Sequence, residues 1–104
     1  MKLVILGGGE SGVGAALLGR KLGYSVFLSD KGMLKEEFRQ ILLQHEIQFE
    51  EGRHTEERFL DAGLVVKSPG IPDKAPLVLQ FRQKGIEVIS EIEFAGRHSA
   101  AEFI

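Results

Sequence analysis

A glycine-rich loop near the start of the chain has the residue spacing of a diphosphate-binding turn. Gly7, Gly9 and Gly12 satisfy the pattern G-x-G-x-x-G, directly after the apolar run Leu3–Leu6. In such a loop one glycine makes the tight turn, one lets the backbone approach a diphosphate, and one lets the following helix pack closely on the strand. The N-terminus of that helix adds free N–H groups and a partial positive charge. The spacing therefore predicts an anion site, and a plain strand-to-helix turn is the alternative.

The loop lacks the side chains that hold the triphosphate and magnesium of ATP. Gly7 and Gly12 have the outer spacing of a Walker A loop, but Val13 and Gly14 stand where lysine and serine or threonine are required. Glu10 also brings a carboxylate into the loop, which at about 4 Å from a phosphate would cost about 1–4 kcal/mol per charge pair. We therefore expect the backbone of Glu10 to donate hydrogen bonds while its side chain points to solvent.

Two further segments are expected at the same edge of a sheet. Asp30 ends the second apolar run, where an acid in dinucleotide-binding folds accepts hydrogen bonds from a ribose or a base. The alternative is a turn aspartate that caps Lys31 and Gly32. The segment Ser68–Pro72 ends the strand expected beside the first one, and open parallel sheets bind ligands at the carboxyl ends of such strands. A plain strand-ending turn is again the alternative.

The elements that must position these segments alternate along the chain. Short apolar runs predict buried parallel strands, and apolar residues at helical spacing predict the helices between them. Ser11 and Thr55 are the expected helix caps. The alternation predicts an α/β fold, a Rossmann-like parallel sheet of about five strands with helices on both faces. The expected strands are residues 3–6, 25–29, 47–49, 64–66 and 87–89, and the expected helices are residues 34–45, 55–61, 74–84 and 91–97 with one more that starts at Ser11.

Length and composition exclude several classes of protein. The 104 residues are enough for one domain, and 13 basic against 15 acidic residues give a net charge of −2. That balance argues against a nucleic-acid partner and against an anionic membrane surface. The absence of cysteine excludes disulfides and thiolate metal sites. Because no apolar run approaches the roughly 18 residues of a membrane span and the N-terminal run is too short for a signal peptide, we expect a cytoplasmic domain with no membrane partner.

The remaining polar residues give weaker signals. His45, His54 and His98 are too widely separated for the ligand spacing of a metal site, so no metal is expected. Glu50–Glu51 belong to an acidic run, which is usually a solvated face. Lys67 precedes the Ser68–Pro72 segment, and it either draws a phosphate inward or lies at the surface.

Four segments, in this order along the chain, resemble the N-terminal domain of the Mur ligases. The Ser-Pro-Gly-Ile sequence followed by Gly-Ile-x-Val and Glu-Ile-Glu is similar to the branch that adds D-glutamate. The branch that adds L-alanine usually reads Ser-Ser-Ala-Ile in that place. The resemblance covers essentially the whole chain and about the first quarter of such an enzyme. The four segments are Gly7–Gly12, Ser29–Gly32, Ser68–Pro72 and Gly85–Phe94.

The resemblance implies a role in binding substrate. Residues 1–104 would form a single UDP-substrate-binding domain, the N-terminal part of a larger ligase of peptidoglycan biosynthesis. Its partners would be UDP-N-acetylmuramoyl-L-alanine and the remaining domains of the same protein. The implied site residues are Gly9, Glu10, Ser11 and Gly12 for the diphosphate, Asp30 and Lys31 for the uracil, and Ser68, Pro69 and Gly70 for the ribose and uracil side.

The chain departs from the family in two respects. Many relatives carry an arginine two residues after the aspartate, where this chain has Gly32. Lys31 replaces part of that charge, as a point charge without the stacking plane of a guanidinium. The family's ATP loop, metal-binding residues and C-terminal domain are absent from this sequence. ATP and Mg²⁺ are therefore expected as cofactors of the whole ligase, and this chain alone is expected not to be catalytic.

Two other interpretations compete with a ligase domain. An NAD(P)-binding Rossmann domain of a dehydrogenase or regulatory module is one, because Gly7, Gly9, Gly12 and Asp30 fit both classes. The other is a folding unit that binds nothing by itself. The segments downstream of Asp30 favour the ligase.

Overall fold

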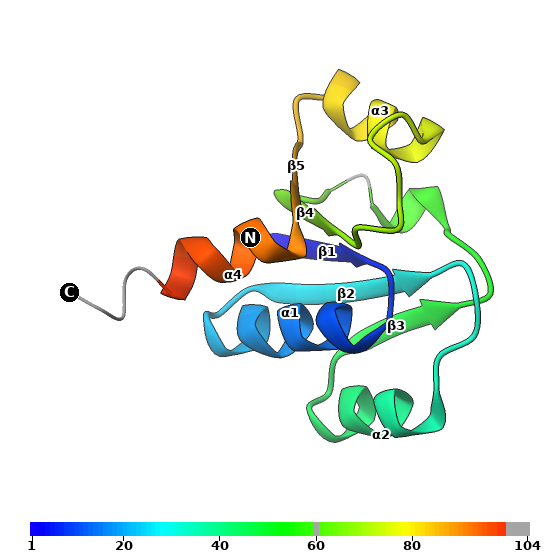
Figure 1. Ribbon diagram of the computed structural model, residues 1–104, viewed down its shortest axis with the longest axis vertical. Helices are drawn as coiled ribbons and strands as arrows, with labels where there is room; N and C mark the ends of the chain where they lie inside the picture. The colour runs from blue at the N-terminus through cyan, green and yellow to red at the C-terminus, as the bar shows by residue number, and fades with distance from the viewer. Residues whose placement is uncertain (60, 100–104) are drawn as a thin grey trace.

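In the computed structural model, which describes residues 1–59 and 61–99, five parallel strands form one sheet (Figure 1). The strand order is β3-β2-β1-β4-β5, and every neighbouring pair is parallel. This confirms the predicted α/β fold. The strands are β1 (Lys2–Leu6), β2 (Ser25–Asp30), β3 (Gln48–Glu51), β4 (Leu64–Lys67) and β5 (Glu87–Ser90). The helices are α1 (Glu10–Lys21), α2 (Glu36–Gln44), α3 (Pro76–Gln83) and α4 (Glu91–Ser99), with a short 3₁₀ helix η1 (Glu56–Arg58).

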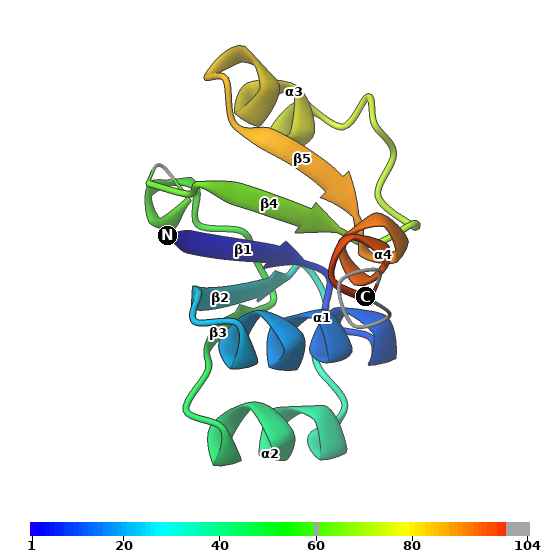
Figure 2. The same cartoon turned by 90° about the vertical axis from the view of Figure 1, so that its left-hand side faces the viewer.

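Helices cover both faces of the sheet, as the alternating side chains of β1 show. Leu3 and Ile5 pack into one buried cluster with residues of α1, α2 and α4. Val4 and Leu6 point to the other face and pack in a second cluster with Phe81 of α3. Figure 2 shows α1 and α2 well apart from α3, with the sheet between them. The four apolar side chains of β1, from Leu3 to Leu6, are fully buried, as expected for a central parallel strand covered on both faces.

The strand order places a topological switch point beside β1. The chain runs outward from β1 to β2 and β3, and then returns to the other side of β1 to form β4 and β5. The connections that follow β1 and β4 therefore lead to opposite faces of the sheet. A crevice opens between such connections at the carboxyl ends of the strands, where open α/β sheets bind their ligands.

The predicted cap at Ser11 was wrong, whereas Thr55 does stand directly before the short helix η1. Helix α1 begins one residue earlier, at Glu10, so Ser11 lies inside its first turn and Gly9 is the N-cap without a side-chain hydrogen bond. The predicted helix over residues 55–61 is reduced to the three residues of η1, and residue 60 lies outside the described part. The Thr55 carbonyl oxygen accepts the Arg58 N–H at 3.0 Å, and the Thr55 hydroxyl donates to Glu50 at 2.6 Å.

The helices within residues 1–59 and 61–99 are short. None of them is both long enough and apolar enough to cross a lipid bilayer.

Candidate functional site

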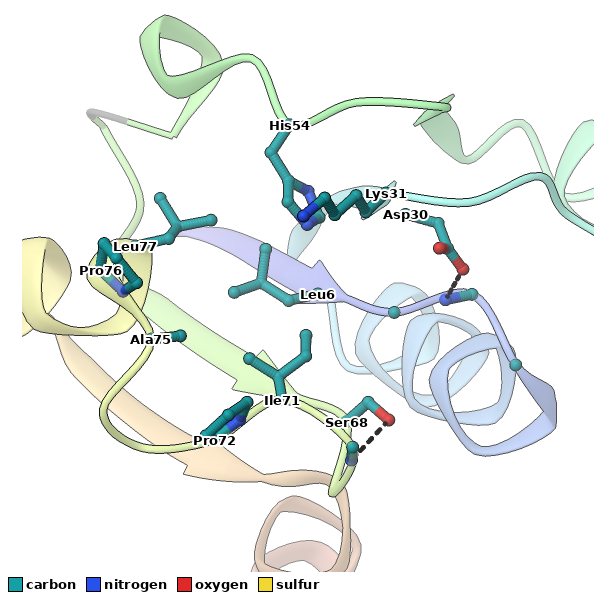
Figure 3. Close-up of a pocket in the computed structure, with 14 residues that line it drawn as sticks. Leu6, Asp30, Lys31, His54, Ser68, Ile71, Pro72, Ala75, Pro76 and Leu77 are labelled. Carbon is teal, nitrogen blue, oxygen red and sulfur yellow. Dashed lines mark hydrogen bonds between the residues drawn. The ribbon is translucent and has the colours of Figure 1, made fainter.

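A cleft of about 670 Å³ lies at the carboxyl ends of β1, β2 and β4 (Figure 3). Its volume falls in the range of roughly 300–1,000 Å³ that is usual for small-molecule sites. It occupies the switch point that the strand order predicts. The lining residues are Leu6, Gly7, Gly8, Gly9, Asp30, Lys31, His54, Ser68, Gly70, Ile71, Pro72, Ala75, Pro76 and Leu77.

The three glycines of the loop have different physical roles. Gly7 has a φ of +109°, and a Cβ there would lie 2.8 Å from the Ser68 Cβ, so only glycine lets the ends of β1 and β4 approach. A Cβ at Gly12 would lie 1.9 Å from the Gly7 carbonyl oxygen, so this glycine lets α1 pack against the end of β1. Gly9 has nothing within 4 Å of an added Cβ and borders the cleft. Its backbone is therefore open to a ligand.

Asp30 joins the end of β2 to the glycine loop. Its Oδ2 accepts a hydrogen bond from the Gly8 N–H at 2.7 Å, and its Oδ1 accepts one from the Gly32 N–H at 2.8 Å. The alternative interpretation of a turn aspartate is thus correct, and it holds together with a position on the cleft. A carboxylate has about four lone-pair sites, so Asp30 keeps acceptor capacity for a ligand.

Lys67, the last residue of β4, supports the loop that follows this strand. Its side chain is buried, with Nζ 2.9 Å from the Ile71 carbonyl oxygen and 3.4 Å from the Asp73 carboxylate. It therefore holds the loop after β4 and is not a surface residue, while a role in drawing a phosphate inward stays a prediction. In the same loop the Gly70 N–H donates to the Ser68 Oγ at 3.4 Å.

The two walls of the cleft differ in polarity. One wall is apolar and carries prolines and branched side chains, and Figure 3 shows them facing Asp30, Lys31 and His54 across the cleft. A planar ligand with apolar faces and polar edges would match this division. The apolar wall consists of Leu6, Ile71, Pro72, Ala75, Pro76 and Leu77.

His54 is the cleft residue that the sequence did not single out. Its Nδ1 lies 2.7 Å from the buried Ser29 Oγ. Burial lowers the pKa of His54, and the carboxylates of Glu50 and Asp30 only partly oppose that effect. The ring is therefore neutral at physiological pH. The position of His54 shortly after β3 could have placed it near the site, because connections that follow neighbouring parallel strands lie at the same edge of the sheet.

Glu50 is buried, so its assignment to a solvated face was wrong. Only 8% of the residue is exposed, and its carboxylate accepts hydrogen bonds from the Thr55 hydroxyl at 2.6 Å and the Thr55 N–H at 2.9 Å. Burial alone would raise the pKa of Glu50, but the hydrogen bonds from Thr55 and Ser29 outweigh it and the pKa is lowered. The ionised form of Glu50 is therefore favoured, behind the residues that line the cleft.

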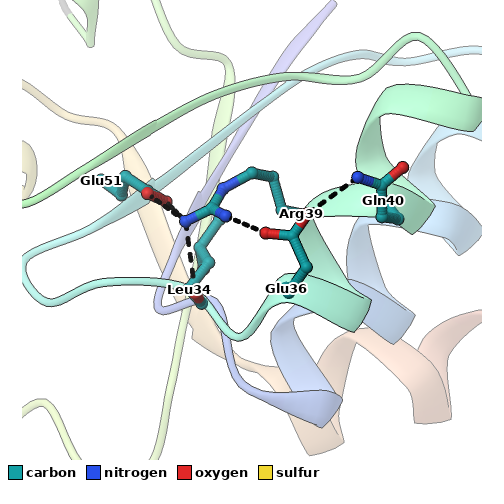
Figure 4. A network of polar contacts seen from close by, with 5 residues as sticks. All are labelled: Leu34, Glu36, Arg39, Gln40 and Glu51. Atoms are coloured by element: carbon teal, nitrogen blue, oxygen red, sulfur yellow. Dashed lines mark hydrogen bonds and ion pairs between the residues drawn. The ribbon is translucent and has the colours of Figure 1, made fainter.

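An ion-pair network supports the loop that carries Lys31 (Figure 4). The Arg39 Nη2 donates to both oxygens of Glu51, at 2.6 and 3.0 Å, and reaches the Leu34 carbonyl oxygen at 3.5 Å. Arg39 also pairs with Glu36, one turn earlier in α2. The network therefore ties the β2–α2 connection to the end of β3.

The structure brings five of the nine predicted site residues to the cleft. Of the residues predicted to bind the diphosphate, Gly9 lines the cleft. Glu10 is exposed on α1, and Gly12 is buried where α1 packs against the end of β1. Ser11 borders a separate hollow of about 290 Å³ between α1 and α4, beside the buried Glu91. Burial raises the pKa of Glu91, and a hydrogen bond from Ser11 partly offsets the rise. The cleft residues are Gly9, Asp30, Lys31, Ser68 and Gly70, and Pro69 is not among its lining residues.

Glu10, Ser11 and Gly12 can still donate hydrogen bonds through their backbone N–H groups. The N–H groups in the first turn of an α-helix have no partner inside the helix. In α1 these groups follow directly after the cleft-lining glycines. Contact between them and a diphosphate stays a prediction.

The described residues do not fit a nucleotide triphosphate with its metal. Within residues 1–59 and 61–99, no three His, Asp or Glu side chains are grouped so that they could hold a metal ion. Val13 and Gly14 occupy the places of the Walker A lysine and hydroxyl residue. No step that uses ATP or Mg²⁺ is therefore assigned to these residues.

Sequence comparisons identify close relatives. The family described as the MurD N-terminal domain matches residues 2–76. The UDP-N-acetylmuramoylalanine–D-glutamate ligase of Christiangramia forsetii is 54% identical over 103 residues, which are 99% of this chain and 23% of that protein. The ligase of the same name from Cytophaga hutchinsonii is 59% identical over 105 residues, with the same coverage. The chain thus spans about a quarter of the length of these curated relatives.

Solved structures share the fold. The UDP-N-acetylmuramate–alanine ligase MurC from Thermotoga maritima superimposes with a TM-score of 0.82 at 22% identity, covering 98% of this chain and 23% of that one. A murein peptide ligase from Psychrobacter arcticus gives a TM-score of 0.79 at 26% identity, covering 93% and 20%. Both agree with the parallel sheet and its helices.

Proposed function

This chain belongs to the MurD N-terminal domain family, and we propose that it binds the UDP part of UDP-N-acetylmuramoyl-L-alanine. It would do so as the N-terminal domain of the cytoplasmic ATP-dependent ligase that adds D-glutamate in peptidoglycan biosynthesis. The observation that carries the proposal is the cleft, which unites the glycine loop, the end of β2 and the loop after β4 at one switch point. Relatives that bear the name of that ligase match 99% of the chain.

Each part of the cleft suits one part of a UDP group. The diphosphate would approach the open backbone at Gly9 and the free N–H groups of the first turn of α1. The base would lie against the apolar wall, with Lys31 as a donor at its edge. Asp30 would use its remaining lone pairs for the ribose or the base. Ser68 and Gly70 would complete the ribose side.

Catalysis is assigned to other parts of the ligase. The chain spans 23% of the length of its curated relatives, and its glycine loop does not fit ATP with Mg²⁺ for the reasons given above. We propose that ATP and Mg²⁺ act in the remaining domains, which would also complete the substrate site. The role of this chain is to hold the substrate by its nucleotide end.

An amide-resolved NMR titration tests the proposal. The chain is titrated with UDP-N-acetylmuramoyl-L-alanine and, separately, with NAD. We expect shifts centred on the amides of residues 7–12, 30–32 and 68–70 with the UDP compound, and no comparable response to NAD. A stronger response to NAD would instead assign the cleft to a dinucleotide. Shifts with the UDP compound that avoid these three segments would place its site elsewhere.

A further inference from the structure

A buried chain of hydrogen bonds ends at the cleft. Ser29 is fully buried, and its Oγ lies 2.7 Å from the His54 Nδ1, 3.2 Å from a Glu50 carboxylate oxygen and 3.2 Å from the Arg53 carbonyl oxygen. Glu50 is fixed in turn by two hydrogen bonds from Thr55. The His54 imidazole is therefore fixed through its Nδ1 by the buried Ser29, while the residue borders the cleft.

The proton count along this chain determines the tautomer of the histidine. A carboxylate and a backbone carbonyl only accept hydrogen bonds, and a serine hydroxyl has a single proton to donate. If Ser29 gave that proton to His54, the oxygens of Glu50 and Arg53 would face its lone pairs without a hydrogen. The stable arrangement has Ser29 directing its one proton toward these oxygens and accepting from the His54 Nδ1–H. A neutral imidazole protonated at Nδ1 leaves Nε2 as an acceptor.

The cleft then presents an acceptor beside a donor. Lys31 and His54 both line the cleft, and the charge of Lys31 acts on the His54 ring. The charged groups that act on the ring are Glu50 behind it, and Asp30 and Lys31 around it. Lys31 offers an ammonium donor, and Nε2 of His54 offers a lone pair. Together they form a donor–acceptor pair at the edge of the cleft.

We propose that His54, locked in its Nδ1–H tautomer by Ser29 and Glu50, is a specificity-determining residue that selects uracil over cytosine. The inference rests on the proposed function, that the cleft takes a UDP group. The ring N3–H of uracil would donate to Nε2 of His54, and the C4 carbonyl of uracil would accept from Lys31. Cytosine has no proton on N3 and carries an amino group at C4, so it would set acceptor against acceptor and donor against donor.

The tautomer can be measured without any nucleotide. In the ¹⁵N-labelled chain, two-bond ¹H–¹⁵N correlation spectra distinguish the protonated ring nitrogen from the bare one. We expect the His54 Nδ1 to have the pyrrole-type shift and Nε2 the pyridine-type shift at neutral pH. The opposite assignment would overturn the proposal, even if UDP binds in the cleft.

Base selection is measured by titrating the same chain with UDP and with CDP. We expect UDP to bind about tenfold more tightly, as for one hydrogen bond whose loss leaves a polar group unpaired. The variant His54→Phe should lose this preference, while His45→Phe, at an exposed histidine after α2, should keep it. Equal binding of UDP and CDP to the unaltered chain would overturn the role of His54 and leave the proposed function intact. If neither nucleotide shifts the cleft amides, both proposals fall.

Discussion

Substitution of Gly9 by alanine should weaken ligand binding without preventing the chain from folding. Gly9 has a φ of −75°, which any residue adopts, and an added Cβ would meet nothing within 4 Å. The variant Gly9→Ala should therefore fold, with a stability loss of order 1 kcal/mol or less from a poorer helix N-cap. The methyl group would, however, stand where a diphosphate must approach the backbone. Loss of one hydrogen bond to a charged group costs about 1.5–3 kcal/mol, so UDP should bind about 10- to 150-fold more weakly.

The matched control lies five positions along the same helix. Gly14 in α1 is exposed and also has nothing within 4 Å of an added Cβ, but it does not border the cleft. Gly14→Ala should raise stability by about 0.5–1 kcal/mol, because glycine is unfavourable inside a helix, and should leave UDP binding unchanged. Thermal unfolding followed by circular dichroism measures the first quantity, and NMR titration measures the second. Binding by Gly9→Ala at the strength of the unaltered chain would refute the assignment of the loop to the diphosphate.

Three further changes test the surroundings of the cleft. Glu10→Gln should leave the affinity for UDP unchanged in a titration, because the side chain is exposed and does not line the cleft, so that only its backbone is expected to donate; a clear loss would give the carboxylate a positive role. Arg39→Met should lower the unfolding temperature and weaken UDP binding, because it releases the Lys31 loop from Glu51, whereas unchanged values in both assays would show that the network is dispensable. The pKa of His54 is lowered on folding from 6.5, so the unfolded chain binds the proton more tightly. Its contribution to stability is therefore present above pH 6.5 and is lost as the pH falls toward the folded pKa. Chemical denaturation of the unaltered chain and of His54→Phe across pH 7 to 5 measures it, and equal pH dependence of the two would contradict the assignment.

The fold could be predicted because its signals are local. The apolar run Leu3–Leu6 forms most of β1, and each of its four side chains is fully buried. Glycines such as Gly7 and Gly23 marked the ends of the elements that they follow. The glycine spacing also located one corner of the cleft. These signals depend on residues close together in sequence, where the period of apolar side chains and the freedom of glycine decide the structure.

The polar residues were harder to predict because their environment depends on distant partners. Glu50 resembled part of a solvated acidic run, yet Ser29 in another strand and Thr55 in the next connection enclose it. A surface position was one of two alternatives for Lys67, but the return of the chain at Ile71 gives the ammonium of this buried side chain a carbonyl acceptor. His54 could not be identified from ligand spacing, since its partner Ser29 lies 25 positions away. Neither charge pattern nor residue spacing records such contacts.

The contacts that hold the strand ends together also build the site before any ligand arrives. Gly7 allows the end of β1 to approach Ser68, and Asp30 binds the Gly8 N–H from the end of β2. Lys67 fixes the apolar wall from inside β4. Because these ties are hydrogen bonds between side chains and the backbone, together with close packing, little ordering entropy remains to be lost on binding, and preorganisation of this kind favours affinity. A substitution at Asp30 would therefore disturb the glycine loop as well as any ligand contact. Gly9, where an added methyl group meets nothing within 4 Å, and His54, which is hydrogen-bonded to Ser29 outside the glycine loop, are the cleaner measures of what the cleft recognises.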